Sequence, residues 1–471
     1  MKDTKKYEEC RQLQLQFEDY LYETRVEPGD NTGVQSISST SDKGKDDDNE
    51  YDKRLLEEIL DPENLNLAVR RVKANKGSHG VDGMAVDELL QHLKQNGEEL
   101  RQSILKGVYA PKPVRRVEIP KPDGGKRLLG IPTVIDRVIQ QAIAQILSPI
   151  YEREFSENSY GFRPNRNAKQ AVLKCKEYIE SGYTWVIDID LAKYFDTVNH
   201  DKLMRLLSKT IKDGRVLSLI RKYLKSGVMI SGVRVETDEG CPQGGNFSPL
   251  LSNIMLNELD KELSKRGLNF CRYADDCNIY VKSRKAATRA MKSITKFIEI
   301  KLKLKVNKEK SAVDRPWKLK FLGYSFYCIK GRIGIRVHQK SVRRFKLKLK
   351  EITGRSNGKS MIHRMLKLKQ LITGWVNYFS LADMVSITKK LDEWLRRRIR
   401  MCCWKQWKRI KTRHRNLVKL GIDNYQAWQF ANTRKSYWRV SGSHILHRSL
   451  GNNVLNKWGL LSIYETYSYA R

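Results

Sequence analysis

The stretch RYADDCNIYV, residues 272–281, places two adjacent aspartates inside a segment that otherwise has the composition of a β-strand. Aromatic and β-branched residues favour strands, whereas aspartate is depleted from them. Adjacent carboxylates also disfavour each other's charged form unless cations are near. We therefore interpret Asp275 and Asp276 as the tip of a hairpin formed by residues 268–273 and 277–282, placed there to hold a metal ion.

A third carboxylate, Asp190, ends a predicted strand over residues 184–191. If this strand neighbours the hairpin in one sheet, three carboxylates converge at one end of it. Hard oxygen ligands on an open surface suit Mg²⁺, which keeps several waters and takes further ligands from substrate phosphates. Two such ions, about 3.5–4 Å apart, would activate a hydroxyl and stabilise the leaving group of an in-line displacement. Taken alone, the three residues also fit an ordinary Asp-rich turn and a solvated strand end.

The net charge of the 471-residue chain is +37, which favours a polyanionic partner, most commonly nucleic acid. The charge is uneven: residues 1–52 carry 7 basic and 14 acidic side chains, and residues 330–471 carry 33 basic and 6 acidic ones. A basic membrane-surface protein is the alternative, but the sequence has no apolar run long enough to span a bilayer. The first residues contain no apolar signal core, so we expect a cytoplasmic protein.

Seven separated motifs indicate a family. They are IPKPDGGKRLLGIPTVIDRVIQQAI, SYGFRPNRNAKQA, IDIDLAKYFDTV, CPQGGNFSPLLSNIML, RYADDCNIYV, LKVNKEKS and FLGYSF. In the order and spacing of these motifs, residues 54–471 resemble a group II intron-encoded reverse transcriptase/maturase, and the resemblance is to class C members of that family. The sequence shows no H-N-H pattern, and we expect no C-terminal endonuclease domain.

The resemblance implies an α+β right-hand polymerase, with fingers and a ferredoxin-like antiparallel palm sheet, followed by an α-helical thumb/maturase domain and a small basic C-terminal domain. We expect an acidic leader with a disordered linker over residues 1–52, and the fingers with an N-terminal extension and part of the palm over 53–183. The palm with the YADD site is expected over 184–338. The thumb or X domain would follow over 339–415, and a DNA-binding-like region over 416–471.

The resemblance also implies roles for single residues. Asp190, Asp275 and Asp276 would be catalytic and would bind two Mg²⁺ ions, which Mn²⁺ could replace, and Leu191 would add a backbone carbonyl. Five side chains would contact the incoming dNTP: Lys121, Arg127, Phe195, Gln243 and Lys310. Phe195 would exclude the 2′-hydroxyl of a ribonucleotide, and core packing is its alternative reading. The primer grip would comprise Phe321, Leu322 and Gly323.

RNA or template contacts are expected at six positions, for which surface loops and core packing are the plain alternatives: Lys76, His79, Arg163, Arg166, Trp375 and Tyr378. The implied partners are the group II intron RNA, an RNA template with a DNA primer, target DNA and dNTPs. No membrane partner is expected, and both monomer and homodimer remain open.

The expected activity is RNA-directed DNA polymerisation, together with intron binding that promotes splicing and mobility. Features of the sequence oppose three alternative functions. A vestigial polymerase acting only as a splicing factor is opposed by the intact Asp190, Asp275, Asp276, Phe195 and Gln243. A retron or phage-defence enzyme is opposed by the long basic region after residue 339. A two-metal nuclease needs neither a triphosphate-binding hairpin nor a primer grip.

Overall fold

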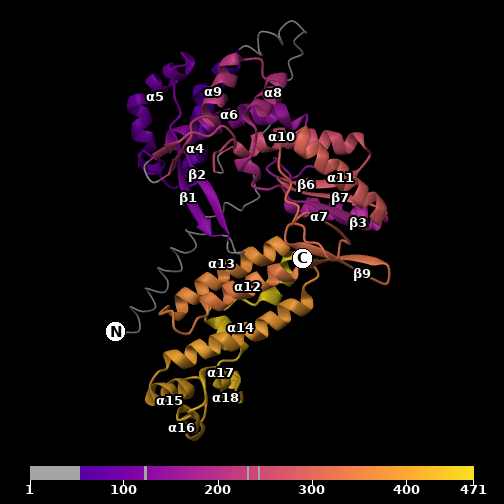
Figure 1. Ribbon diagram of the computed structural model, residues 1–471. Coiled ribbons are helices and arrows are strands. Elements are labelled where there is room, and N and C mark those ends of the chain that lie inside the picture. The colour runs from indigo at the N-terminus through magenta and orange to yellow at the C-terminus, as the bar shows by residue number, and fades with distance from the viewer. Residues whose placement is uncertain (1–53, 121–124, 231–232, 242–243) are drawn as a thin grey trace. The chain divides into compact units, whose positions relative to one another are not determined.

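The computed structural model describes residues 54–120, 125–230, 233–241 and 244–471, so Lys121 and Gln243 lie outside the described residues (Figure 1). The chain divides into two compact units. Unit 1 comprises the described residues up to Cys175 together with Trp185–Val313, and unit 2 comprises Lys176–Thr184 and Asp314–Arg471. Among the described residues, none of the helices is both long and apolar enough to cross a lipid bilayer.

The helices of the first part of the chain begin at side chains that cap them. Asp61, Thr133, Asn199, Asp213 and Ser283 each accept a hydrogen bond from a backbone N–H of the first helical turn, which satisfies a donor that the helix leaves unpaired. The α-helices up to the end of unit 1 are α3 Leu55–Ile59, α4 Pro62–Ala74, α5 Leu89–Leu105, α6 Val134–Glu152, α7 Ala168–Glu180, α8 His200–Thr210, α9 Gly214–Leu224, α10 Ser248–Lys265 and α11 Arg284–Ile300. Two short 3₁₀ turns are η1 Val86–Glu88 and η2 Tyr194–Asp196.

One sheet of unit 1 has the strand order β2-β1-β4-β5. Its strands are β1 Val114–Pro120, β2 Lys126–Ile131, β4 Val228–Ile230 and β5 Val233–Val235. β1 and β2 form the hairpin that the Pro-Asp-Gly-Gly turn predicts, with Pro120 opposite Lys126. β1 also pairs in parallel with β4, which brings this hairpin beside the segment that follows α9.

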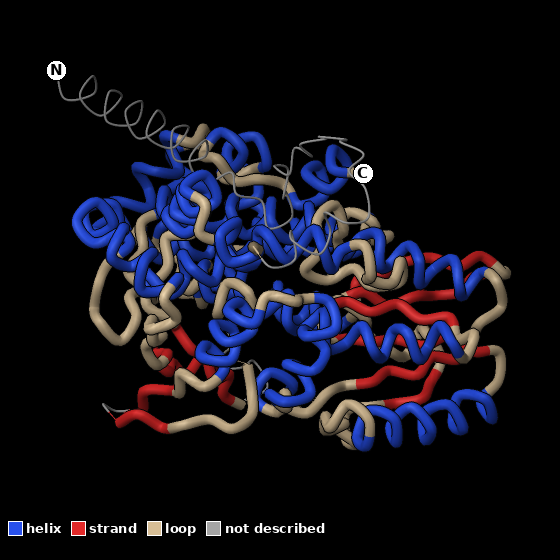
Figure 2. The backbone as a smooth tube through the Cα atoms, turned by 90° about the horizontal axis from the view of Figure 1, so that it is seen from above, coloured by secondary structure: helices blue, strands red, loops and turns tan. Residues whose placement is uncertain are grey.

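A second sheet has the order β6-β7-β3-β8 and carries the acidic residues. Its strands are β3 Trp185–Ile189, β6 Asn269–Tyr273, β7 Asp276–Val281 and β8 Ala312–Asp314. The pairs β6–β7 and β7–β3 are antiparallel, and α11 packs against β3 and β7. Figure 2, in which strands are red and helices blue, shows helices lying beside the strands. β3 and β7 have nearly continuous apolar sequences because they are buried at their centres, as Ile187 and Ile279 show.

One hydrophobic core joins these elements in unit 1. It extends from Leu55 and Ile59 of α3 through α6 and the second sheet to Ile294 and Ile298 of α11. Fully burying one such side chain stabilises the folded state by roughly 1.5–3 kcal/mol. The core therefore fixes the sheet that carries the aspartates.

Unit 2 contains a two-stranded antiparallel ribbon followed by helices. The ribbon and helices are β9 Tyr324–Ile329, β10 Arg332–Val337, α12 Gln339–Ile352, α13 Met361–Phe379, α14 Val385–Gln406, α15 Ile410–Lys419, α16 Asn424–Ala431, α17 Tyr437–Val440, α18 His444–Ser449, α19 Asn452–Lys457 and α20 Ile463–Ala470. Phe345 stacks on Trp375 with ring centroids 4.2 Å apart, joining α12 to α13. The buried Asp392 of α14 accepts hydrogen bonds from the N–H groups of Ile463 and Tyr464, which fixes the start of α20.

Candidate active site

The aspartates lie at one end of neighbouring strands. β3 pairs with β7 so that Ile189 lies opposite Cys277, which puts Asp190 and Asp276 at the next position of the two strands. Asp275 is in the turn between β6 and β7, where Ala274 adopts the left-handed backbone conformation with φ 56°. The predicted hairpin and its pairing with the Asp190 strand are therefore confirmed.

The donor set suits a hard, partly hydrated cation. Asp190 and Asp275 are half-buried and Asp276 is exposed, so carboxylate oxygens remain open to solvent. Within the described ranges, no group of three or more His, Cys, Asp or Glu side chains is arranged to hold a metal ion. An ion at these aspartates would therefore need further ligands from water or substrate phosphate, as Mg²⁺ in phosphoryl-transfer sites commonly does.

The backbone of Asp190 is held on both sides by the segment after α11. The Asp190 N–H donates to Ser311 Oγ at 3.0 Å, and the Asp190 carbonyl accepts from the Asn307 N–H at 2.8 Å. Two residues after Asp190, the Ala192 N–H donates a hydrogen bond to the Lys305 carbonyl at 2.8 Å. The buried Leu191 forms an antiparallel β-bridge with Val306. The structure thus brings LKVNKEKS beside the first aspartate, and the exposed Lys310 lies in this segment.

A buried ion pair supports the YADD turn. Arg272 and Asp260 are both fully buried, and their charged groups are 2.6 Å apart. Arg272 Nη1 also donates to Asn253 Oδ1 and to the Ala274 carbonyl, each at 3.0 Å. Burial alone would lower the pKa of Arg272, but the adjacent Asp260 carboxylate raises it above its usual value. The guanidinium therefore links α10 to the backbone between Tyr273 and Asp275.

The GFR loop packs against the same turn. A Cβ at Gly161 would lie 2.2 Å from the Ala274 nitrogen, so only glycine permits this approach. Asn253 Nδ2 donates to the Gly161 carbonyl at 2.9 Å, and the Tyr160 N–H donates to the Arg272 carbonyl at 2.9 Å. The backbone of the YADD turn is therefore fixed from β6, α10 and the loop before α7.

Phe195 lies beside the start of the CPQGGN loop. Its half-buried ring meets Tyr194 edge-on at 5.2 Å, and it packs against the core. The Phe195 carbonyl accepts a hydrogen bond from the Cys241 N–H at 2.6 Å, and the Gly240 N–H donates to the Val198 carbonyl at 2.8 Å. The segment that leads to Gln243 therefore crosses directly over the Phe195 backbone.

The glycines of the same loop approach protein groups. A Cβ at Gly244, where φ is 119°, would lie 2.6 Å from the Gly130 carbonyl at the end of β2. A Cβ at Gly245 would lie 2.8 Å from Gln140 Oε1, which accepts a hydrogen bond from the Asn246 N–H at 3.0 Å. Both glycines thus permit a close approach of this loop to protein groups, on β2 and α6. On β2, the backbone of Arg127 pairs with Ile119.

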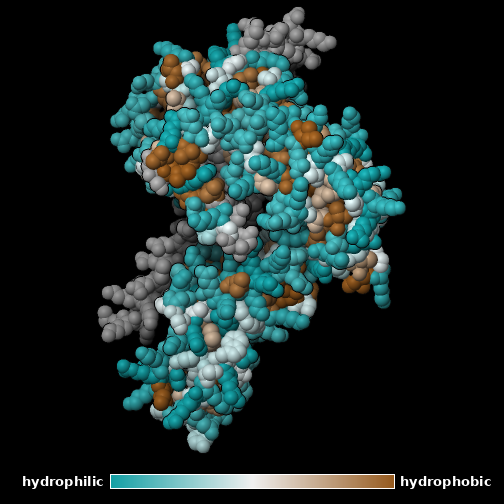
Figure 3. Space-filling view, viewed as in Figure 1, coloured by the Kyte–Doolittle hydropathy of each residue, from teal (hydrophilic) through white to brown (hydrophobic). Residues whose placement is uncertain are grey.

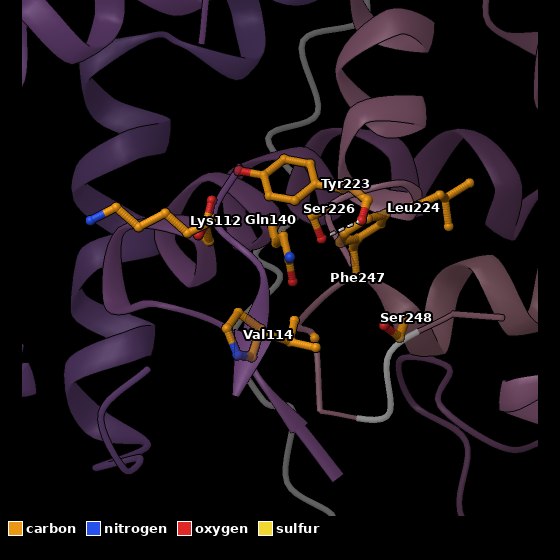
Figure 4. Close-up of a pocket in the computed structure, with 11 residues that line it drawn as sticks. Lys112, Val114, Gln140, Tyr223, Leu224, Ser226, Phe247 and Ser248 are labelled. Atoms are coloured by element: carbon orange, nitrogen blue, oxygen red, sulfur yellow. Dashed lines mark hydrogen bonds between the residues drawn. The ribbon is translucent and has the colours of Figure 1, made fainter. Parts of the chain in front are cut away.

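A small pocket is lined by residues of α6, α9 and this loop (Figure 4). Its volume of about 10 Å³ matches one water molecule, and its walls include Lys112, Gln140, Tyr223 and Ser248. Asp136, also in the wall, accepts hydrogen bonds from Tyr109 at 2.7 Å and Thr133 at 2.6 Å, and burial raises the pKa of its carboxyl. The pocket is too small for a nucleotide, so we assign it a structural role.

Two of the expected RNA contacts lie on an exposed loop whose backbone accepts hydrogen bonds from Arg115 and Arg137. Lys76 and His79 are exposed, and Lys76 has the left-handed φ of 43°. Arg115 donates to the His79 carbonyl at 2.8 Å and to Ser78 Oγ at 2.8 Å, while Arg137 donates to the Ser78 carbonyl. The loop therefore keeps a fixed backbone while presenting both side chains to solvent.

Arg163 and Arg166 differ in exposure. Arg163 is 5% exposed, and its guanidinium contacts Glu152 at 2.7 Å and the carbonyls of Ser156 and Ser159. This position gives Arg163 a packing role within the protein. Arg166 is half-buried and pairs with the exposed Glu157, so a strong anion could compete for its guanidinium.

The FLGY segment of unit 2 forms a tight turn. Phe321 and Tyr324 exchange backbone hydrogen bonds of 3.1 and 2.8 Å, and Leu322 and Gly323 both have positive φ, 50° and 85°. This pattern matches the type I′ hairpin turn. The Gly323 carbonyl accepts from Ser341 Oγ at 3.0 Å, and a Cβ at Gly323 would lie 3.0 Å from the ring of Phe379.

Tyr378 contacts this turn, whereas Trp375 packs in the helical bundle. The Tyr378 hydroxyl donates to the Leu322 carbonyl at 3.0 Å, and its side chain is 42% exposed. Trp375 is half-buried between Phe345 and Phe379. A hydrogen bond therefore connects Tyr378, an expected RNA contact, to the turn expected to form the primer grip.

Sequence reasoning missed the residues that hold the site. Arg272, Asp260 and Asn253 support the YADD turn, and Ser311 and Asn307 hold Asp190. One signal was present: a charged residue, Arg272, stands in a strand pattern at an inward position, and a buried arginine needs an acidic partner. Nothing in the local sequence identifies Asp260 as that partner.

Two protein families match successive parts of the chain. Residues 119–326 match the reverse transcriptase (RNA-dependent DNA polymerase) family, and residues 342–421 match the group II intron maturase-specific domain. The chain is similar to protein YkfC of Escherichia coli K12, with 38% identity over 55% of this chain and 79% of YkfC.

Two further relatives are similar over about half of the chain. Group II intron-encoded protein LtrA of Lactococcus lactis subsp. cremoris is 34% identical, over 51% of this chain and 39% of LtrA. A putative COX1/OXI3 intron 2 protein of Saccharomyces cerevisiae is 33% identical, over 45% of this chain and 25% of that protein. The chain thus spans much of YkfC but well under half the length of these intron proteins.

The reverse transcriptase match contains β3 and β7, the paired strands beside which the aspartates lie. The maturase-specific match follows it along the chain and covers α12–α15. The expected fold, fingers and palm followed by a helical maturase domain, is confirmed. The chain belongs to the family of group II intron-encoded reverse transcriptases/maturases.

Proposed function

We propose that the protein copies RNA into DNA by adding dNTPs to a primer 3′-hydroxyl, and that it also binds its intron RNA to promote splicing and mobility. The observation that carries the polymerase proposal is the pairing of β3 with β7, which puts Asp190 beside the YADD turn. Asp190, Asp275 and Asp276 would hold two Mg²⁺ ions, with Leu191 adding its carbonyl and Mn²⁺ as a substitute. When bound, the ions supply Lewis-acid activation of the hydroxyl and neutralise charge on the phosphates.

The chain's own residues would position the reactants around that site. The buried Arg272–Asp260 pair and Gly161 fix the turn, and Ser311 fixes the Asp190 backbone. Arg127 and Lys121, which flank the Pro-Asp-Gly-Gly sequence, would bind triphosphate, because guanidinium and ammonium groups both suit phosphate. Gln243 and Lys310 are further candidates for dNTP contacts.

The nucleic-acid partners would contact both units. Phe321, Leu322 and Gly323 would grip the primer, and Lys76, His79, Arg166 and Tyr378 are candidates for RNA contacts. In unit 2, the maturase-specific match would provide the intron-binding surface, with the RNA itself performing the splicing chemistry. We also propose target DNA as a partner and a cytoplasmic location.

The decisive experiment is primer extension by the full chain with a DNA primer on an RNA template in Mg²⁺. We expect the wild type to extend the primer and Asp275→Asn to lose at least about 10³-fold of the rate, because a neutral amide is a poor ligand for a hard cation. Asp201→Asn is the matched control, since Asp201 is 85% exposed on α8 and pairs with the surface residue Arg221. Extension by Asp275→Asn at the wild-type rate would contradict the assignment of the site.

Intron-RNA binding separates the polymerase from the splicing role. A folded wild-type protein that binds intron RNA but never extends a primer would support a vestigial polymerase. A protein that extends primers without binding intron RNA more tightly than unrelated RNA would overturn the maturase part of the proposal.

Phe195 tests sugar selection. Phe195→Ala should raise the incorporation of ribonucleotides relative to deoxyribonucleotides by about 10-fold or more, because removal of the ring would open space near the 2′ position. Phe297→Ala is the control for loss of an aromatic ring at the edge of the same core. Single-nucleotide incorporation of rGTP and dGTP measures the ratio, and an unchanged ratio would assign Phe195 to packing alone.

A further inference from the structure

A pocket on the helices of unit 2 combines cations with indole rings. Arg343, Lys346, Leu347 and Lys350 are spaced i, i+3, i+4 and i+7 along α12 and so share one face of that helix. They line a pocket of about 340 Å³ together with Trp394 and Arg398 of α14 and Trp438 of α17. We name this the α12–α14 pocket, and its volume lies in the range of about 300–1,000 Å³ in which small ligands bind.

The walls of the α12–α14 pocket are fixed by internal contacts. Arg398 donates to Thr353 Oγ1 at 2.6 Å, to the Thr353 carbonyl at 2.8 Å and to the Lys350 carbonyl at 3.2 Å. Arg398 and Lys346 both lie over the Trp394 ring, at 5.2 and 4.9 Å from its centroid.

Trp438 is held in the same way, although 37% of it is exposed. The Arg397 guanidinium lies 4.2 Å from its ring centroid and donates to the Trp438 carbonyl at 3.2 Å. An exposed indole that is held in place loses little conformational freedom on binding, so stacking a base on it costs little.

The cations that line the pocket have no acidic ion-pair partner within the part of the chain that the structure describes. Among the described residues, no carboxylate forms an ion pair with any of the four cationic side chains that line it, although Glu351 and Glu393 are close in sequence. The visible surface of these helices is mainly hydrophilic (Figure 3). Uncompensated cations attract phosphate, and the release of its counterions drives binding.

We propose that the α12–α14 pocket binds an unstacked nucleotide of single-stranded RNA, with the base on the indoles and the flanking phosphates on Arg343, Lys346 and Lys350. This inference rests on the proposed RNA-binding function and adds a site to it. A paired base in an A-form helix is not accessible for stacking, whereas single-stranded loops present bases that aromatic side chains can stack on. Single-stranded RNA is therefore the ligand class that fits both features.

The test measures the affinity of the full chain for a fluorescent 12-nucleotide oligouridylate. Trp438→Ala should weaken binding by about 5- to 150-fold, the effect of losing one base–aromatic stack. Trp458→Ala is the matched control, because Trp458 is 40% exposed but does not line the pocket; its affinity should stay within about 2-fold of wild type.

A charge variant tests the phosphate contacts. The double change Arg343→Gln and Lys346→Gln should weaken binding and reduce the slope of log affinity against log salt by about 1.4, or 0.7 for each lost contact. The control is Arg344→Gln with Lys348→Gln, which removes the same charges from exposed α12 positions that do not line the pocket. These surface changes also keep the test valid if Trp438→Ala fails to fold.

The outcomes distinguish this site from the proposed function as a whole. If wild type binds the oligonucleotide while the pocket variants behave like their controls, the pocket is overturned but RNA binding stands. If wild type binds no RNA, both are overturned. If the corresponding RNA duplex binds as tightly as the single strand and is equally affected by the variants, base stacking is overturned. An equal effect with single-stranded DNA would support a nucleotide site that accepts either sugar.

Discussion

At the scale of single residues, the site depends on a charge buried away from solvent. The Arg272 guanidinium is surrounded by the Asp260 carboxylate, the Asn253 amide and the Ala274 carbonyl. Burying an ion pair gains little net stability, but removing one partner leaves an uncompensated charge in the interior. The YADD turn is therefore sensitive to a fully buried residue on α10.

Asp260→Asn should lower the free energy of unfolding by about 3–5 kcal/mol, because Arg272 would keep its charge without a counter-charge. Asp201→Asn, which removes an exposed partner of Arg221, should change it by less than about 1 kcal/mol. Chemical denaturation of both variants measures the difference. Equal effects of the two substitutions would mean that the buried charge is compensated in another way.

At the scale of elements, the N-terminus of α12 connects the helical bundle to the FLGY turn. His338 Nδ1 accepts a hydrogen bond from the Lys340 N–H at 3.2 Å and so caps the helix. The His338 N–H and Ser341 Oγ both donate to the Gly323 carbonyl at 3.0 Å. The cap and the turn therefore depend on the same few residues.

Protonation of His338 should weaken this connection. Burial lowers the pKa of His338, as do the nearby charges of Lys320, Lys340 and Arg336. Since its folded pKa lies below the unfolded value of about 6.5, His338 contributes stability that is complete above pH 6.5 and is lost as pH falls through the folded value. His338→Asn keeps a cap that does not titrate.

We therefore expect wild type to lose more stability than His338→Asn when the pH is lowered from 7.5 to 5. Denaturation followed by tryptophan fluorescence at both pH values measures this. Parallel losses in the two proteins would show that the cap remains intact when His338 is protonated.

Local sequence patterns predicted the elements that local forces define. The YADD hairpin and the Pro-Asp-Gly-Gly hairpin carry strand periodicity and turn residues, and both form. The apolar pattern over residues 54–74 is divided between α3 and α4, because Asp61 caps a new helix whose first residue is Pro62. The short strands β4 and β5 were missed, since their pairing with β1 is a tertiary contact that no local pattern specifies.

At the scale of the whole molecule, charge is separated along the chain. Residues 330–471 carry 33 basic and 6 acidic side chains, whereas residues 1–52 carry 14 acidic and 7 basic ones. Phosphate contacts would then dominate RNA affinity through counterion release. Such binding depends strongly on the salt concentration and only weakly on the RNA sequence.

The logarithm of intron-RNA affinity should fall linearly with the logarithm of salt concentration, by about 0.7 for each neutralised single-strand phosphate. Filter binding between 50 and 200 mM KCl measures the slope. An RNA of the same sequence with uncharged methylphosphonate linkages is the control and should show almost no slope. A flat response of the natural RNA would contradict an electrostatic interface.

The hydrogen bond between Asp190 and Ser311 joins residues 121 positions apart, which has a consequence for synthesis on the ribosome. At about 5–20 residues per second, Ser311 is added roughly 6–24 s after Asp190. When the YADD turn has just been synthesised, the nascent chain still lacks Asn307 and Ser311. The two hydrogen bonds that hold the backbone of Asp190 therefore cannot yet form. The candidate active site therefore cannot be completed before nearly all of unit 1 has been translated.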